Sequence, residues 1–272
     1  MPLTLKKVDY AYHAGTPLRT DALTGVSLTL EPGEFVGLMG PTGCGKSTLL
    51  QIAAGLLTPT RGSVSADGVV GMVFQNPDHQ LFESTLEREI AFAPKCQGLG
   101  EAEIRERVDE ALRVVGLDAP ELRERSPFSL SGGEKRRAVL AGVLAMDPKW
   151  LLLDEPLAGL DAEGAEILLA CLRERCAQGT AVLMACHDPD VICENASRVI
   201  RMDGGRIVFD GTPEEAFDES RHPEMELSEL GSVRGTVVRL REAGLELPDG
   251  ITRFRDLTAA LRSVLAERGS HV

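Results

Sequence analysis

The sequence lacks any hydrophobic run long enough to cross a membrane. Its apolar stretches, such as Ala138–Met146, fall well short of the ~18 residues that a transmembrane helix needs. The first residues also lack a charged segment followed by a long apolar one, so we expect no secretory signal. With 43% hydrophobic and 26% charged residues among 272, the composition predicts a globular chain with a sizeable core, built as one large domain with at most a small appendage.

Basic residues are scarce, and the cysteines lack the spacing of a metal site. Lys and Arg number 29 against 42 Asp and Glu, and the resulting net charge of −13 opposes binding to nucleic acid through phosphate contacts. The six cysteines include no C-x-x-C pair, which disfavours a zinc site. We therefore expect free thiols in a reducing compartment.

Short apolar runs alternate with amphipathic stretches along most of the chain. Strands are predicted at Leu3–Val8, Gly25–Leu30, Glu34–Met39, Gly62–Ala66, Val69–Phe74, Trp150–Leu153, Thr180–Cys186, Val199–Met202 and Arg206–Phe209. Helices are predicted at Thr48–Leu57, Glu101–Gly116, Glu134–Met146 and Glu163–Gln178, and in the tail at Val233–Ala243 and Asp256–Glu267. This alternation is typical of an α/β fold with a largely parallel sheet.

A glycine-rich segment between a predicted strand and a predicted helix matches G-x-x-x-x-G-K-[ST] in full. It consists of Gly40, Pro41, Thr42, Gly43, Cys44, Gly45, Lys46 and Ser47, followed by Thr48. Glycines let backbone N–H groups turn towards phosphate oxygens, and the helix N-terminus adds positive potential. Lys46 is suited to neutralise the β and γ phosphates, and Ser47 to ligate Mg²⁺. The motif alone predicts nucleotide binding and fits kinases, GTPases, recombinases and transporter ATPases alike.

Two carboxylates end the apolar strand around Leu151–Leu153. Asp154 and Glu155 at the carboxyl end of a buried strand, beside a phosphate-binding loop, suit Mg²⁺ binding and water activation. We expect Asp154 to hold the metal's hydration shell and Glu155 to polarise the attacking water. The alternative is that two surface acids merely end a strand.

The segment Leu130, Ser131, Gly132, Gly133 resembles the signature of ATP-binding-cassette (ABC) ATPases. Its serine and glycines open a predicted helix, which makes a second anion-binding helix N-terminus. One chain cannot easily bring both helix ends to the same γ-phosphate, so two chains facing head to tail would solve the geometry. By itself the segment also fits a plain helix N-cap at Ser131.

The order of motifs supports the resemblance from Leu3 to Phe217. The phosphate loop is followed by Gln75, the signature, the acid pair, Gly159-Leu160-Asp161 and His187. The resemblance implies that Gln75 contacts Mg²⁺ or water, that His187 contacts the γ-phosphate and that Asp161 lies at a dimer interface, although Asp161 also suits a helix N-cap. It implies that Tyr12 stacks on adenine, with local packing as the alternative.

The implied fold is a P-loop NTPase of the ABC type. It has a mixed-sheet core over residues 1–225, with a helical subdomain at about 76–147, and a small C-terminal helical extension over 226–272.

A subgroup is indicated by Gln75–Phe82, which reads Q-N-P-D-H-Q-L-F and is similar to the Q-N-P-x-x-Q-L-F of energy-coupling-factor ATPases. Ala91–Pro94, Gly142–Met146 and Leu240–Leu245 are similar to that group as well. The resemblance implies an ATP- and Mg²⁺-dependent ATPase at the cytoplasmic face of the cell membrane. Its implied partners are a transmembrane coupling subunit, a substrate-binding membrane subunit and a second ATPase chain, identical or different, but no nucleic acid.

The implied solute is a transition-metal ion or a vitamin, which the sequence does not name. The alternatives are the ATPase of another ABC importer class and an ABC ATPase that serves no transporter. Members of the latter kind that act on DNA carry long coiled-coil insertions, for which the stretch between Gly40 and Ser131 has no room, and translation-type members usually carry two cassettes.

Two further hypotheses follow from local chemistry. Acids near Gln75 are expected to meet basic residues of a membrane partner: Asp78, Glu83, Glu87 and Glu89. Cys44, in the phosphate loop at a helix N-terminus, is expected to react with alkylating reagents unless ATP protects it.

Overall fold

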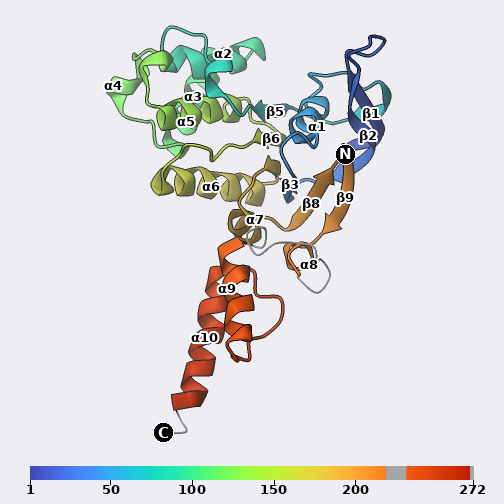
Figure 1. Cartoon of the computed structure of the whole chain (residues 1–272). Helices are drawn as coiled ribbons and strands as arrows, with labels where there is room; N and C mark the ends of the chain where they lie inside the picture. Colours follow the sequence, from blue (N-terminus) through green and yellow to red (C-terminus); the bar gives the residue numbers. More distant parts are fainter. Residues whose placement is uncertain (219–230, 270–272) are drawn as a thin grey trace.

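The computed structural model describes residues 1–218 and 231–269 (Figure 1). A three-stranded antiparallel sheet has the order β2-β1-β4, with β1 (Leu3–Tyr12), β2 (Thr20–Leu30) and β4 (Arg61–Ser65). The β1 and β2 strands are longer than predicted, because the second half of β1 and the first half of β2 form a bulged hairpin whose exposed side chains weaken the apolar signal.

The second sheet is mixed and six-stranded, with the order β5-β6-β7-β3-β8-β9. Its first five strands are parallel, and β9 forms an antiparallel hairpin with β8. The sheet confirms the predicted α/β class. The strands are β3 (Phe35–Met39), β5 (Val70–Val73), β6 (Trp150–Asp154), β7 (Ala181–Ala185), β8 (Arg198–Asp203) and β9 (Arg206–Gly211).

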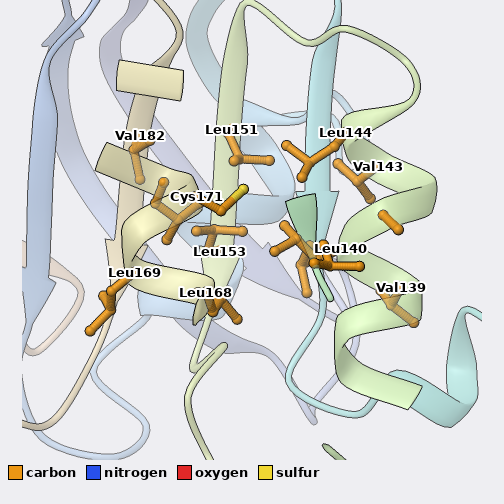
Figure 2. Close-up of a cluster of buried hydrophobic side chains, with 14 of the residues drawn as sticks. Val139, Leu140, Val143, Leu144, Leu151, Leu153, Leu168, Leu169, Cys171 and Val182 are labelled. Carbon is orange, nitrogen blue, oxygen red and sulfur yellow. The ribbon is translucent and has the colours of Figure 1, made fainter. Parts of the chain in front are cut away.

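The central strands of this sheet are buried on both faces. In β6, Leu151 and Leu153 face the cluster formed with α5 (Gly132–Leu144) and α6 (Ala162–Ala177), as Figure 2 shows. Trp150 and Leu152 face the opposite side, towards α1 (Lys46–Ala53) and the antiparallel sheet. Burial on both faces explains why these strands read as continuous apolar runs rather than alternating ones.

A group of helices covers the β5 side of the sheet (Figure 1). It consists of the short η1 (Pro77–His79), α2 (Leu86–Cys96), α3 (Glu101–Val114), α4 (Pro120–Arg123) and η2 (Pro127–Ser129), together with α5. The α2 helix has no counterpart in the sequence prediction, and Pro94 lies inside it. Its N-terminus is capped by Thr85, and Leu86 and Ile90 are buried, so packing outweighs the poor helix propensity of proline.

The C-terminal helices α9 (Gly231–Glu242) and α10 (Phe254–Gly269) have a small apolar cluster of their own. They attach to α7 (Pro189–Asn195), whose Asp190 accepts hydrogen bonds from the N–H groups of Ser232 and Val233 at 2.7 and 3.1 Å. Glu194 of α7 accepts one from Phe254 N–H at 2.8 Å. The predicted boundary at 225 lies outside the described residues.

Two smaller features complete the fold. The α1 helix ends at Ala53 rather than at the predicted Leu57, because Gly55 turns the chain with a φ of 74°. The α8 helix (Pro213–Ala216) begins with a capping box formed by Thr212 and Glu215. None of the described helices has the length and apolarity to span a membrane.

Gly71 of β5 lies against α5 with no room for a side chain. A Cβ there would lie 2.5 Å from Val143 Cγ1 and 3.2 Å from Pro148 Cβ. We expect Gly71→Ala to lower the free energy of unfolding by about 1–3 kcal/mol, because the helix must shift. Urea denaturation measures the change.

Gly142 of α5 provides the matched control, since a Cβ there meets nothing within 4 Å. Gly142→Ala is expected to raise the free energy of unfolding by about 0.5–1 kcal/mol, because alanine favours the helix. A Gly71→Ala protein as stable as the wild type would contradict the close packing of Gly71 against Val143.

Candidate functional site

Four neighbouring parallel strands end at the same edge of the six-stranded sheet. The phosphate loop follows β3, Gln75 comes just after β5, Asp154 ends β6 and is followed by Glu155, and His187 comes just after β7. Ligands of open α/β sheets bind outside the carboxyl ends of the strands. The topology thus gathers segments that lie far apart in the sequence.

A cleft of about 320 Å³ lies at this edge. Eleven predicted site residues line it: Tyr12, Thr42, Gly43, Gly45, Lys46, Ser47, Thr48, Gln75, Asp154, Glu155 and His187. Thr20, Asp21 and Ala22 also line it, and no motif marks these three. They reach the cleft because the β1–β2 hairpin extends further than its sequence pattern indicates.

The phosphate loop is packed too tightly for side chains at two of its glycines. A Cβ on Gly40, whose φ is 143°, would lie 2.2 Å from Met202 O. One on Gly45, whose φ is 108°, would lie 2.7 Å from Ala22 O. Across the loop, Lys46 Nζ donates hydrogen bonds to Gly40 O at 2.7 Å and to Pro41 O at 3.1 Å. The lysine is thereby held over the loop's concave backbone.

Glu155 combines a strained backbone with a buried carboxylate. Its φ of 51° is in the left-handed region, which non-glycine residues rarely adopt. Burial raises the pKa of its carboxyl group, whereas the electrostatic influence of the neighbouring His187 and Lys46 opposes the rise. His187 Nε2 lies 3.0 Å from Glu155 Oε1, but the direction of approach makes no hydrogen bond, and Oε1 is buried without a donor from the described residues. A buried acceptor of this kind fits a bound water.

Tyr12 lies at the rim of the cleft, partly exposed. Its hydroxyl oxygen is 3.0 Å from Thr48 Oγ1, and its ring meets that of Tyr10 edge to face at 5.0 Å. The hydrogen bond ties the aromatic ring to the helix that follows the phosphate loop. Tyr12 therefore packs locally and is also accessible at the rim of the cleft.

The signature residues and Asp161 do not line this cleft. Ser131 forms a capping box with Glu134, and Asp161 accepts a hydrogen bond from Gly164 N–H at 2.9 Å at the start of α6. The helix N-caps considered from the sequence are thus both observed. Gly132 and Gly133 form the first turn of α5.

The structure corrects the hypothesis on Cys44. Cys44 is only 5% exposed, so its thiol is not accessible to an alkylating reagent in this conformation.

The acids near Gln75 are mostly engaged within the chain. Asp78 pairs with Lys135 at 2.8 Å, and Glu87 approaches Arg123 at 3.7 Å. Glu89 is buried and accepts hydrogen bonds from the N–H groups of Phe82 and Glu83 at 2.9 and 2.7 Å. Three of the four acids therefore have partners in the chain itself. Asp78 and Glu87 nevertheless stay about half exposed, and the same surface also exposes Phe82 and Phe92, packed edge to face at 4.7 Å.

These features define a nucleotide-hydrolysing cassette, and comparison with known proteins agrees. The family model described as "ABC transporter" matches residues 23–158. A dimeric bacterial ABC transporter cassette of known structure is 29% identical, with a TM-score of 0.70 over 78% of this chain and 98% of that one. The chain belongs to the ABC transporter family.

Further relatives define the subgroup. The energy-coupling factor transporter ATP-binding protein EcfA2 of Symbiobacterium thermophilum is 44% identical over 98% of both chains. The EcfA protein of Methanothermobacter thermautotrophicus is 39% identical, over 92% of this chain and 83% of its own. The solved structure of cbiO1 from Clostridium perfringens, described as part of the ABC transporter complex cbiONQ, is 34% identical with a TM-score of 0.71, over 89% of this chain and 96% of that one. Within its family the chain thus groups with the ATP-binding proteins of energy-coupling factor transporters.

Proposed function

We propose that the chain hydrolyses ATP in this cleft and thereby powers an energy-coupling factor importer. The observation that carries the proposal is the convergence of the phosphate loop, Gln75, the acid pair and His187 on one cleft. The membership in the ABC transporter family and the named relatives support it.

The donors in the cleft fit Mg²⁺ bound together with ATP. Ser47, Gln75 and Asp154 bring oxygen atoms to the same cleft, which is the ligand type that Mg²⁺ prefers. Among the described residues no group of three His, Cys, Asp or Glu side chains could hold a metal ion. Mg²⁺ commonly binds through one or two protein groups, water and the nucleotide's phosphates. When bound, the ion would neutralise charge on the β and γ phosphates.

Each of the remaining residues has a distinct task in this proposal. Lys46 supplies a positive charge to the β and γ phosphates. Glu155 accepts a hydrogen bond from the attacking water and orients it, for which its buried Oε1, to which no described residue donates a hydrogen bond, is suited. His187, next to Glu155, contacts the γ-phosphate. Tyr12 provides an aromatic surface for adenine.

We assign Ser131, Gly132, Gly133 and Asp161 to the contact with a second ATPase chain. None of them lines the chain's own cleft, and the start of α5 presents a helix N-terminus suited to phosphate. In a head-to-tail dimer the signature of one chain would complete the cleft of the other. The related cassette described as dimeric supports the formation of a dimer. The second chain is identical to this one or a sibling.

The chain is further proposed to sit at the cytoplasmic face of the membrane, held there by membrane subunits. The related cbiO1 is described as part of an ABC transporter complex. We assign the docking surface to the exposed pair of Phe82 and Phe92, which lies on the segment just after Gln75 and on α2. A transition-metal ion or a vitamin would be the solute, selected by a membrane subunit. The phosphate loop is proposed to bind the phosphates of ATP and the signature to contact the second chain. Residues 1–225 are proposed to form the nucleotide-binding domain, and residues 226–272 a C-terminal extension.

Replacing the Glu155 carboxylate tests the hydrolytic site. We expect Glu155→Gln to slow ATP hydrolysis by a factor of about 10² or more, because the amide binds water without accepting its proton. ATP affinity should be retained. Phosphate release measures the first quantity and equilibrium binding of a fluorescent ATP analogue the second. Glu174→Gln, at an exposed position on α6, is the control, and wild-type turnover by Glu155→Gln would refute the assignment.

Two substitutions separate the ring of Tyr12 from its hydroxyl. Tyr12→Ala is expected to weaken ATP binding about 10-fold, since aromatic stacking on a base contributes about 1–3 kcal/mol. Tyr12→Phe keeps the ring but loses the contact with Thr48, and should bind nearly as well as the wild type. Equal losses in both variants would indicate that the hydroxyl, not the ring, supports binding.

Affinity purification of the tagged chain from native membranes in mild detergent tests the transporter assignment. Mass spectrometry should identify small polytopic membrane proteins, whose identity narrows the solute, and any second ATPase chain. Phe82→Ser should reduce their recovery, whereas Val208→Ser, at an exposed apolar residue on β9, should not. Recovery of no membrane protein, with ATP hydrolysis intact, would favour an ABC ATPase that serves no transporter.

A further inference from the structure

A buried guanidinium connects the two loops that carry Gln75 and Glu155. Arg136 lies in the second turn of α5 and is 9% exposed. Its Nη1 donates a hydrogen bond to the backbone carbonyl of Glu155 at 2.6 Å. Its Nη2 donates one to the backbone carbonyl of Gln75 at 2.9 Å. In the described parts of the chain, no other side chain donates a hydrogen bond to either carbonyl.

Burying the charged guanidinium of Arg136 requires desolvation free energy, which an apolar side chain would not require. Burial lowers the pKa of Arg136, and the negative charge of Glu155 opposes the change. An apolar side chain could fill the same space without desolvating a charge. The two hydrogen bonds are therefore the feature that distinguishes arginine from a packing residue here.

The bond to Glu155 acts on a strained peptide. Glu155 has a φ of 51°, and its backbone is held from both sides. Its N–H donates to Ala185 O at 3.1 Å, and its carbonyl accepts from Ala158 N–H at 3.3 Å as well as from Arg136. Because the direction of a side chain follows its backbone torsion, these bonds help to keep the carboxylate of Glu155 in the cleft.

The same guanidinium belongs to the helix that begins with the signature. Ser131 caps α5, and Arg136 follows on that helix, so any movement of α5 relative to the sheet displaces the carbonyls that Arg136 holds. The side chains of Gln75 and Glu155 both line the cleft. One rigid helix is thus connected to both of them by a single residue.

We propose that Arg136 is a positioning residue for ATP hydrolysis. It couples the positions of Gln75 and Glu155 to each other and to the position of α5. It touches neither nucleotide nor water and acts through the two backbone carbonyls. The inference rests on the proposed roles of Gln75 and Glu155. It predicts an effect on turnover that is separate from ATP binding, since Lys46, Tyr12 and the phosphate loop are untouched.

The test uses the purified full chain, alone and with any subunits that copurify. Arg136→Met removes both donors while keeping a long side chain, and is expected to lower kcat by a factor of about 10², the scale of a misplaced catalytic group. The KM for ATP and the Kd of a fluorescent ATP analogue should change less than about 3-fold. Arg136→Lys, which keeps one charged donor group, should recover part of kcat.

Arg107→Met is the matched control. Arg107 on α3 also donates to a backbone carbonyl, that of Ala145 just beyond α5, at 3.4 Å, but contacts neither loop of the cleft. Its removal should leave kcat unchanged. If Arg136→Met folds with unchanged kcat, or loses ATP affinity in proportion to kcat, the proposal is wrong and Arg136 only supports the fold.

If Arg136→Met fails to fold, Arg136→Lys carries the test, and an unchanged kcat for that variant overturns the proposal. A wrong assignment of Glu155 to the hydrolytic site would be detected by a different variant. In that case Glu155→Gln would retain hydrolysis, whatever the Arg136 variants do.

Discussion

Parallel backbone pairing of β3 with β7 is the interaction on which the rest of the site depends. Phe35 pairs with Val182 and Leu38 with Ala185, and β7 pairs in turn with β6, and β6 with β5. The pairing brings the phosphate loop, the acid pair, Gln75 and His187 to one edge, although they come from segments spread over most of the chain. Since all four strands run in the same direction, every one of them delivers its functional residue at the same side.

The α5 helix links this edge to the rest of the molecule. Its apolar face packs on β5 and β6, where Gly71 leaves room for Val143. Its N-terminus carries the signature, and Lys135 and Arg136 reach the segment around Gln75. Because α5 packs on the core, carries the signature and contacts the loops of the cleft, a displacement at one of these places can be transmitted to the others. The packing density of such an interface favours movement as a rigid unit over local adjustment.

A second connection leads from the cleft towards the C-terminus. His187 is followed directly by α7, and α7 supplies the acids that cap both C-terminal helices, Asp190 for α9 and Glu194 for α10. Carboxylates at helix N-termini satisfy free N–H groups and interact favourably with the helix dipole. The C-terminal helices are therefore attached beside the cleft, although their apolar cluster is separate from the main core.

The sequence by itself determined the local chemistry of this protein. The phosphate loop, the acids after an apolar strand, the caps of α5, α6 and α8, and the alternation of strands and helices all follow from residues close together in the chain. Their physics is local, because glycine torsions, capping bonds and apolar periodicity depend on a few neighbours. The α2 helix could not be predicted from local sequence, because the packing of Leu86 and Ile90 outweighs the poor helix propensity of the proline inside it.

Only the tertiary structure decided how distant residues meet. Ala22 closes over the phosphate loop, Asp78 is neutralised by Lys135, and Arg136 holds the carbonyl of Gln75 from 61 positions away. Local spacing could not predict these contacts, since hydrogen bonds and burial between remote segments exist only once the sheet and α5 have packed. For the same reason, Glu89, which looked available for a partner in the sequence, is buried in the folded chain and accepts hydrogen bonds from the loop at Phe82 and Glu83.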